Sequence, residues 1–167
     1  MSRAGPAGPR VSAPAGVRVD AFVADSVAIV GGKLHVEGAG WNHLLVRRLP
    51  AVRSRIGLAL LLRLPTAEAG TRQHPLAIRL EAPDGRPIVL GYESADESSA
   101  LDRVEGTFSV EAPIPESPLH EQILPLALNF DELTLEQAGA YRFVIAIDGA
   151  DAKIVSFAVA TADLFDA

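Results

Sequence analysis

The residues best suited to chemistry lie close together in one short segment, Glu37–His43, which runs Glu-Gly-Ala-Gly-Trp-Asn-His. It predicts a loop that presents Trp41, the only tryptophan, to a ligand or a protein partner, with Glu37, Asn42 and His43 as polar contacts. The alternative is a strand bend or bulge at the two glycines, with Trp41 packed over the open end of the core. We favour the bend, because tryptophan is usually well buried in a domain of this size.

The histidines are a second source of chemistry. His35 and His43 would meet across such a bend, and a first-row metal there would need a third ligand such as Glu37. The spacing matches neither a His-Glu-x-x-His pair nor a facial triad. We therefore assign no metal and expect solvated side chains on polar faces for all four histidines: His35, His43, His74 and His120.

Carboxylates and serines offer no catalytic arrangement. The pairs Asp96-Glu97 and Asp131-Glu132 are adjacent in sequence, and adjacent side chains on a strand point apart. The segment Ser94–Ser99 lacks the glycines of a nucleophile elbow, and Gly38-Ala-Gly40 lacks the helix and lysine of a phosphate loop. The sequence assigns no catalytic residue and no cofactor, and it favours a protein that is not an enzyme.

Asp25 interrupts an apolar alternation that runs from Val19 to Ile29. An inward aspartate is costly unless it is hydrogen-bonded. Either the strand bulges there and shifts its phase, or Asp25 caps a corner, or it is a buried acid without a visible partner.

Composition excludes several classes of function. Without cysteine there is no disulfide, no thiol nucleophile and no cysteine-based metal site. A net charge of −6 and scattered positive charge argue against binding along a nucleic-acid backbone. The longest apolar run, Ile56–Leu62, is too short to span a bilayer, and no signal peptide is visible. We expect a cytoplasmic protein without a membrane partner.

The elements that must position these residues are strands, because apolar residues recur with period two. Glycine-containing turns at Gly31-Gly32, Pro83–Gly85 and Asp148-Gly149 separate the strands, with one strand expected at Ile88–Leu90. Strands with one apolar face and one solvent-exposed face are typical of antiparallel sheets. The clearest apolar sets are Ile56, Leu58, Leu60, Leu62 and Leu64; Leu76, Ile78 and Leu80; Val104, Phe108 and Val110; Leu124, Leu126, Leu128 and Phe130; and Tyr141, Phe143, Ile145 and Ile147.

The predicted fold is all-β: an antiparallel, two-sheet, immunoglobulin-like β-sandwich of eight to nine strands. Residues 1–16 are expected to form a disordered Gly/Pro/Ala-rich tail, residues 17–162 the single domain, and residues 163–167 a short C-terminal tail. The segment Leu133–Phe143 resembles the tyrosine corner of immunoglobulin-like domains, with Tyr141 after a glycine-containing turn. The cysteines and tryptophan that accompany this corner in antibody domains are missing.

Two longer segments resemble an uncharacterised bacterial family of unknown function, the one numbered 6941. They are Val19–Ala28 with Gly32–Trp41 and Leu49-Pro50, and Pro125–Phe130 with Gly139–Gly149. Together they cover nearly all of residues 17–160. The resemblance implies a compact β fold in a cytoplasmic bacterial context, and no activity or site residue.

Two functions from different classes follow. The first is a binding or assembly module that engages an unknown protein partner or a second copy through a sheet edge or through Glu37–His43. The Pro113–Pro118 stretch would then shield one edge or form a loop. The second is a small-ligand or metal-binding protein, or an enzyme, that uses the same segment. Carbohydrate binding is weaker, because aromatic residues make up only 5% of the chain.

Overall fold

The computed structural model describes residues 16–66, 72–92, 99–109 and 116–162. These residues form an all-β sandwich, as predicted, but with more strands than expected, partly because β7 and β8 are only two residues long. The twelve strands of the described residues are β1 (Arg18–Ala24), β2 (Ser26–Val30), β3 (Lys33–Glu37), β4 (His43–Val46), β5 (Ala51–Pro65), β6 (Gln73–Glu81), β7 (Gly91–Tyr92), β8 (Ala100–Leu101), β9 (Arg103–Ser109), β10 (Glu121–Leu135), β11 (Gly139–Ile147) and β12 (Ala150–Thr161).

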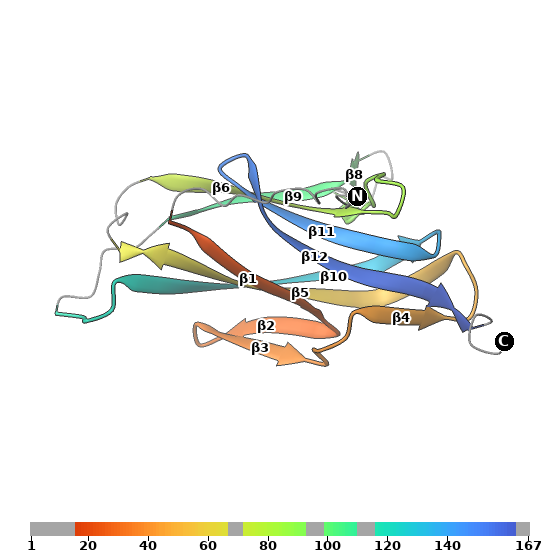
Figure 1. Cartoon of the computed structure of the whole chain (residues 1–167), viewed down its shortest axis with the longest axis horizontal. Coiled ribbons are helices and arrows are strands. Elements are labelled where there is room, and N and C mark those ends of the chain that lie inside the picture. The colour runs from red at the N-terminus through yellow and green to blue at the C-terminus, as the bar shows by residue number, and fades with distance from the viewer. Residues whose placement is uncertain (1–15, 67–71, 93–98, 110–115, 163–167) are drawn as a thin grey trace, which may run out of the picture.

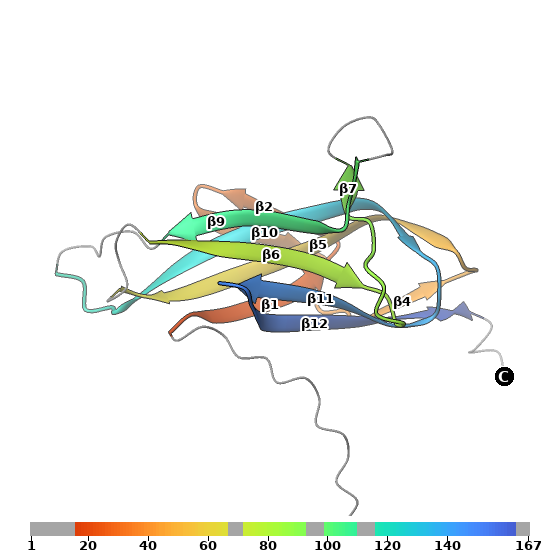
Figure 2. The same cartoon turned by 90° about the horizontal axis from the view of Figure 1, so that it is seen from above.

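Two main sheets face each other. One has three strands in the order β1-β5-β10, and the other has five in the order β4-β12-β11-β6-β9. Every pair is antiparallel except β4 with β12. Figure 1 shows the two sheets as stacked layers, and Figure 2 shows β9 and β10 running along the same side of the molecule.

The core lies between the sheets and follows the predicted alternation. Leu58, Leu60 and Leu62 of β5 all share the inner face and are fully buried. The aromatic side chains stack across the interior, with ring centroids 5.3 Å apart for Phe130 and Phe143. Such stacked contacts add to the free energy gained by burying the rings.

The tyrosine corner predicted from sequence is present. Tyr141 is fully buried, and its Oη donates to the carbonyl oxygen of Gln137 at 2.9 Å. The Tyr141 hydroxyl oxygen also accepts a hydrogen bond from the Gln137 backbone amide at 3.2 Å. Gly139 between them has a φ of 127° and lies against Pro83, so a side chain there would be strained.

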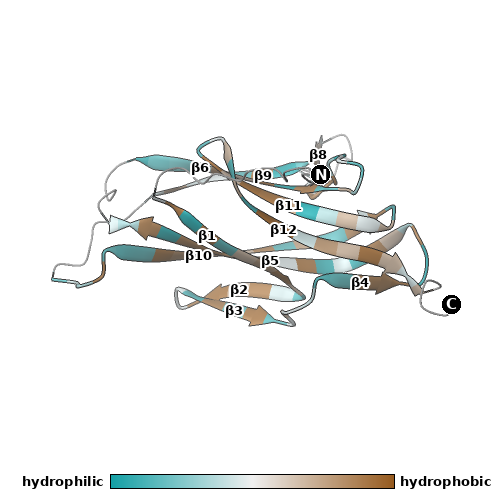
Figure 3. Ribbon diagram, in the orientation of Figure 1, coloured by the Kyte–Doolittle hydropathy of each residue, from teal (hydrophilic) through white to brown (hydrophobic). Residues whose placement is uncertain are grey.

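The β2–β3 hairpin, predicted at Gly31-Gly32, belongs to neither main sheet. It lies on the outer face of the three-stranded sheet as a partial third layer, and Figure 3 shows how apolar both its strands are. Gly57 of β5 permits the close approach, because a Cβ there would lie 3.1 Å from the Ser26 backbone. Asn129 of β10 then clamps Val27: its Nδ2 donates to the Val27 carbonyl at 2.8 Å, and its Oδ1 accepts from the amide at 3.0 Å.

Asp25 occupies the corner between β1 and β2. Its amide donates to the carbonyl oxygens of Glu37 and Gly38, at 3.0 and 3.2 Å. The side chain is exposed and pairs with Arg53 at 3.2 Å. The corner interpretation is therefore correct, and the alternative of a buried acid is wrong.

The expected strand at Ile88–Leu90 does not form. The segment instead follows β6 as a loop, with the Ile88 amide donating to the Leu80 carbonyl at 2.8 Å. Only one isolated bridge joins Glu81 to Pro87. Pairing cannot extend further along β6, because β9 occupies this edge from Arg79 onward and β11 occupies the other edge.

Of the predicted tails, residues 1–15 and 163–167 lie outside the described residues, as do Val110 and the first part of the Pro113–Pro118 stretch. Within the described part of the chain, no helix has the length and apolar character needed to cross a membrane.

Candidate functional site

The Glu37–His43 segment forms the bend that the sequence favours. It links the end of β3 to the start of β4, and Gly38 and Gly40 both have positive φ, 64° and 95°. At Gly38 a Cβ would collide with the Asp25 carboxylate, so glycine is required there for space as well as for conformation.

Trp41 is anchored and not presented as a free aromatic contact. It is half-buried against the core, and its ring meets Phe157 edge to face with centroids 5.9 Å apart. Its Nε1 is buried and has no hydrogen-bond partner in the described structure. The backbone beside it is also fixed, because the Asn42 carbonyl accepts from the Ala158 amide at 2.8 Å.

The polar residues of this segment remain on the surface. Glu37, Asn42 and His43 are exposed, and His43 Nδ1 lies 2.6 Å from the Asn42 Oδ1. His35, His43 and His120 are exposed as expected. Nowhere in the described ranges do three His, Asp or Glu side chains gather closely enough to hold a metal ion.

The expectation of a solvated side chain is wrong for His74. It is only 2% exposed, stacks on Phe108 with centroids 5.2 Å apart, and places Nδ1 2.9 Å from the Asp148 carboxylate. Asp148, in the β11–β12 turn, also lies 3.6 Å from Arg72. The signal was available: His74 continues the inward alternation of Leu76, Ile78 and Leu80.

The carboxylate pair at Asp131-Glu132 is not a catalytic dyad. Arg55 donates to both oxygens of Asp131, at 2.6 and 3.0 Å, and these hydrogen bonds lower the pKa of Asp131. A general acid needs the opposite shift. Asp96-Glu97 and most of Ser94–Ser99 lie outside the described residues.

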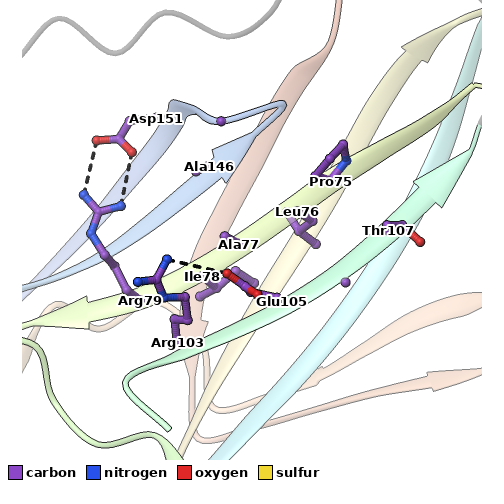
Figure 4. A pocket seen from close by; sticks show the side chains of 12 residues that line it. Pro75, Leu76, Ala77, Ile78, Arg79, Arg103, Glu105, Thr107, Ala146 and Asp151 are labelled. Carbon is purple, nitrogen blue, oxygen red and sulfur yellow. Dashed lines mark hydrogen bonds and ion pairs between the residues drawn. The ribbon is translucent and has the colours of Figure 1, made fainter.

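A depression of about 690 Å³ lies on the outer face of the five-stranded sheet (Figure 4). Ala77 and Ala146 are among its lining, and two ion pairs cross it. Arg79 bonds Asp151 at 3.2 and 3.3 Å, which raises the pKa of Arg79, and Arg103 lies 3.5 Å from Glu105. The charges of these residues are mutually compensated, and none of the described residues that line the depression is aromatic.

A different cleft opens into the core between β9 and β10. Its volume is about 230 Å³, and its lining is largely apolar. Gly106 faces inward between Val104 and Phe108, and a Cβ built on it meets nothing within 4 Å. The residues that line the cleft are Leu76, Ile78, Val104, Glu105, Gly106, Thr107, Phe108, Leu126, Ala127 and Leu128.

Strand β9 brings this cleft to a sheet edge. It pairs with β6 on one side, and it ends the order of its sheet on the other. Its seven residues contain no proline, and the β6–β9 register has no bulge. Proline and bulges are two of the devices by which natural proteins protect such an edge, and β9 carries only a third, the exposed charges of Arg103 and Glu105. Sequence reasoning anticipated a sheet edge as a contact surface but did not identify β9 or the cleft.

Comparisons with known proteins give a family and several solved structures, among them the two that follow, and no curated protein matches. An alkylpurine DNA glycosylase from Pseudomonas fluorescens, bound to DNA containing an abasic site analog, is 11% identical with a TM-score of 0.43. The match covers 89% of this chain and 31% of that chain. An immunoglobulin-like protein from Pseudomonas aeruginosa is 17% identical with a TM-score of 0.40, over 89% of this chain and 100% of that one.

Both TM-scores are low, so the architecture rests on the strand pairing described above. The family match is more extensive, because it covers residues 19–160. It also agrees with the resemblance of Val19–Trp41 and Pro125–Gly149 noted from sequence. The chain belongs to the family of unknown function DUF6941.

Proposed function

We propose that this chain is a non-enzymatic binding or assembly module that engages a protein partner, or a second copy of itself, through the free edge of β9. In line with the sequence, we place this activity in the cytoplasm. The observation that carries the proposal is the combination of an edge strand that has no proline or bulge in its described residues with an apolar cleft directly beside it.

The other candidate surfaces support binding less well. Trp41 already packs on Phe157, so it has little apolar surface left for a partner. The ion pairs around the outer depression are exposed, and charges of this kind contribute little binding free energy by themselves. The edge of β9 combines outward-facing backbone groups with half-exposed apolar side chains in the adjoining cleft.

The test is the oligomeric state of the chain when it is purified from its native host without an affinity tag. Size-exclusion chromatography with light scattering should give a mass above that of one 17.6 kDa chain, through self-association or a stoichiometric partner. Thr107→Pro should return the mass to that of a monomer, because proline removes a donor from the edge. Thr107→Val keeps the backbone amide and should retain the complex.

A chain that is monomeric and free of partners in its native host, at its native abundance, would contradict the proposal. If the assembly forms equally well in the Thr107→Pro variant, the contact does not use the edge of β9.

A further inference from the structure

The chemistry of the partner can be inferred from β9, and this step rests on the proposed function. The cleft and the edge constrain three features of whatever binds there: its backbone, the side chain that faces inward, and the charges that face outward.

The backbone direction of β9 follows from its pairing with β6. Pro75 lies opposite Thr107, and the Pro75 carbonyl accepts from Asp148 on the far side of β6 at 3.0 Å. Proline has no amide hydrogen, so Pro75 and Thr107 form a non-hydrogen-bonded pair. The N–H and C=O of Thr107 therefore point away from β6, and by the alternation of the ladder those of Glu105 and Arg103 do so too.

Among the described residues, these outward-facing groups of Glu105 and Thr107 have no backbone partner. An aliphatic chain would fill the cleft but leave them unpaired. An extended polypeptide would satisfy them with the regular bonds of an antiparallel ladder. The edge therefore favours a peptide segment over a lipid tail.

The inward-facing side chain is specified by Gly106. In an antiparallel pair, the residue directly opposite shares the same face, with Cβ atoms about 5 Å apart. Because Gly106 contributes no side chain, the residue opposite it faces open space lined by Leu126, Leu128 and Val104. A bulky aliphatic residue at this position would bury its surface in the cleft and cover these half-exposed neighbours.

The outward-facing charges specify the residues on either side. Arg103 and Glu105 lie on the solvent face of β9, 59% and 66% exposed. Their contact is 3.5 Å long and leaves both groups accessible. Opposite charges across a strand pair are favourable, so a partner gains from a cation opposite Glu105 and an anion opposite Arg103.

We propose that the edge of β9 captures an extended protein segment, antiparallel to it, in which a bulky aliphatic residue sits opposite Gly106, a basic residue opposite Glu105 and an acidic residue opposite Arg103. From its N-terminus to its C-terminus, the segment follows the pattern Thr-Leu-Lys-Val-Glu, with the leucine in the cleft and the threonine opposite Thr107.

The test uses the full chain and a fluorescein-labelled peptide with Thr-Leu-Lys-Val-Glu at its centre and Gly-Ser flanks. Fluorescence anisotropy should give saturable binding. Replacing the peptide leucine by alanine should weaken the affinity about tenfold or more, because it removes most of the buried apolar surface. Exchanging the lysine and glutamate should weaken it less.

Variants of the chain separate the contributions. Gly106→Val fills the cleft from within, so it should remove binding while the Tm rises or stays level. Thr107→Pro should also remove binding, whereas Thr107→Val should retain it. In hydrogen exchange, peptide should protect the outward amides of Glu105 and Thr107.

Absence of saturable binding, equal binding of a scrambled peptide, or unchanged affinity in Gly106→Val would each overturn this inference. Displacement of the peptide by decanoate, with no protection of the Thr107 amide, would overturn it in favour of a lipid tail. A native complex lost in Thr107→Pro but kept in Gly106→Val would refute the cleft-filling residue and leave the proposed function standing.

Discussion

The two long sides of the sandwich are built from the same alternating strands, yet one is closed and the other open. On the closed side β1 and β12 are in contact, and Val19 and Val23 of β1 are only 8% and 3% exposed. On the open side, β9 and β10 are separated by a cleft, and the inward-facing Leu126 and Val104 remain half-exposed. Alternation therefore does not determine burial at the sides, because burial there depends on whether the strands that flank the opposing sheets come into contact.

The two strands of the open side also differ in protection. Pro125 removes one donor from β10, and the β2–β3 hairpin packs over its outer face through Asn129. Strand β9 has neither a proline nor a covering hairpin in its described residues. A contact surface at the open side is therefore expected on β9.

The sharpest test of this contrast compares two leucines on the same inner face. Leu60→Ala should lower the free energy of unfolding by about 3–4 kcal/mol, because Leu60 is fully buried at the centre of the core. Leu126→Ala at the open side should cost only about 1–2 kcal/mol, because the side chain is half-exposed. Urea unfolding measures both, and equal losses would show that the open side is sealed in solution.

Two glycines lie within strands and do not have a positive φ. Replacing each of them by alanine should change the free energy of unfolding in opposite directions. Gly57→Ala should destabilise the fold by about 2 kcal/mol, because its Cβ would crowd the Ser26 backbone and Val27. Gly106→Ala should stabilise it by about 0.5 kcal/mol, because the added Cβ meets open space and the unfolded chain loses freedom. Thermal unfolding distinguishes them, and a destabilising Gly106→Ala would contradict an open cleft.

The hairpin over β10 should depend on its side-chain clamp. Asn129→Ala removes both hydrogen bonds to Val27 and should cost about 1–2 kcal/mol. Hydrogen exchange should accelerate across β2 and β3 and change little in β11. His35→Ala, on the exposed face of the same hairpin, is the control and should leave exchange unaltered. Unchanged exchange in Asn129→Ala would mean that apolar packing alone holds the hairpin.

The smallest expected effect concerns acid pH at the closed side. The hydrogen bond from Arg63 lowers the pKa of Asp20 most, and the charge of Lys153 on β12 lowers it further. Because the folded-state pKa is lowered, the stabilisation is present above the ordinary value near 4 and is lost as pH falls through the lowered pKa. Carbon-detected NMR should show the Asp20 pKa returning toward its ordinary value in Arg63→Gln, with a smaller change in Lys153→Gln. An unchanged titration would exclude the ion pair.

Much of the fold was predictable because it depends on local pattern. Period-two alternation identified the faces of β5, β6, β10 and β11, and the Gly139-to-Tyr141 spacing identified the corner that closes on Gln137. The bend at Glu37–His43 was also predictable, since only glycine tolerates the conformation and the crowding at Gly38. The strand expected at Ile88–Leu90 does not form, because β9 and β11 already occupy both edges of β6 beyond the single bridge at Glu81.

The sequence by itself determined which residues alternate, where the chain turns and which aromatic residue closes the corner, because these depend on neighbours along the backbone. The tertiary structure alone decided that the hairpin lies outside both sheets, that His74 meets Asp148, and that β9 and β10 stay apart. These depend on contacts between segments far apart in sequence, and a period of two specifies which side chains share a face without specifying what covers that face.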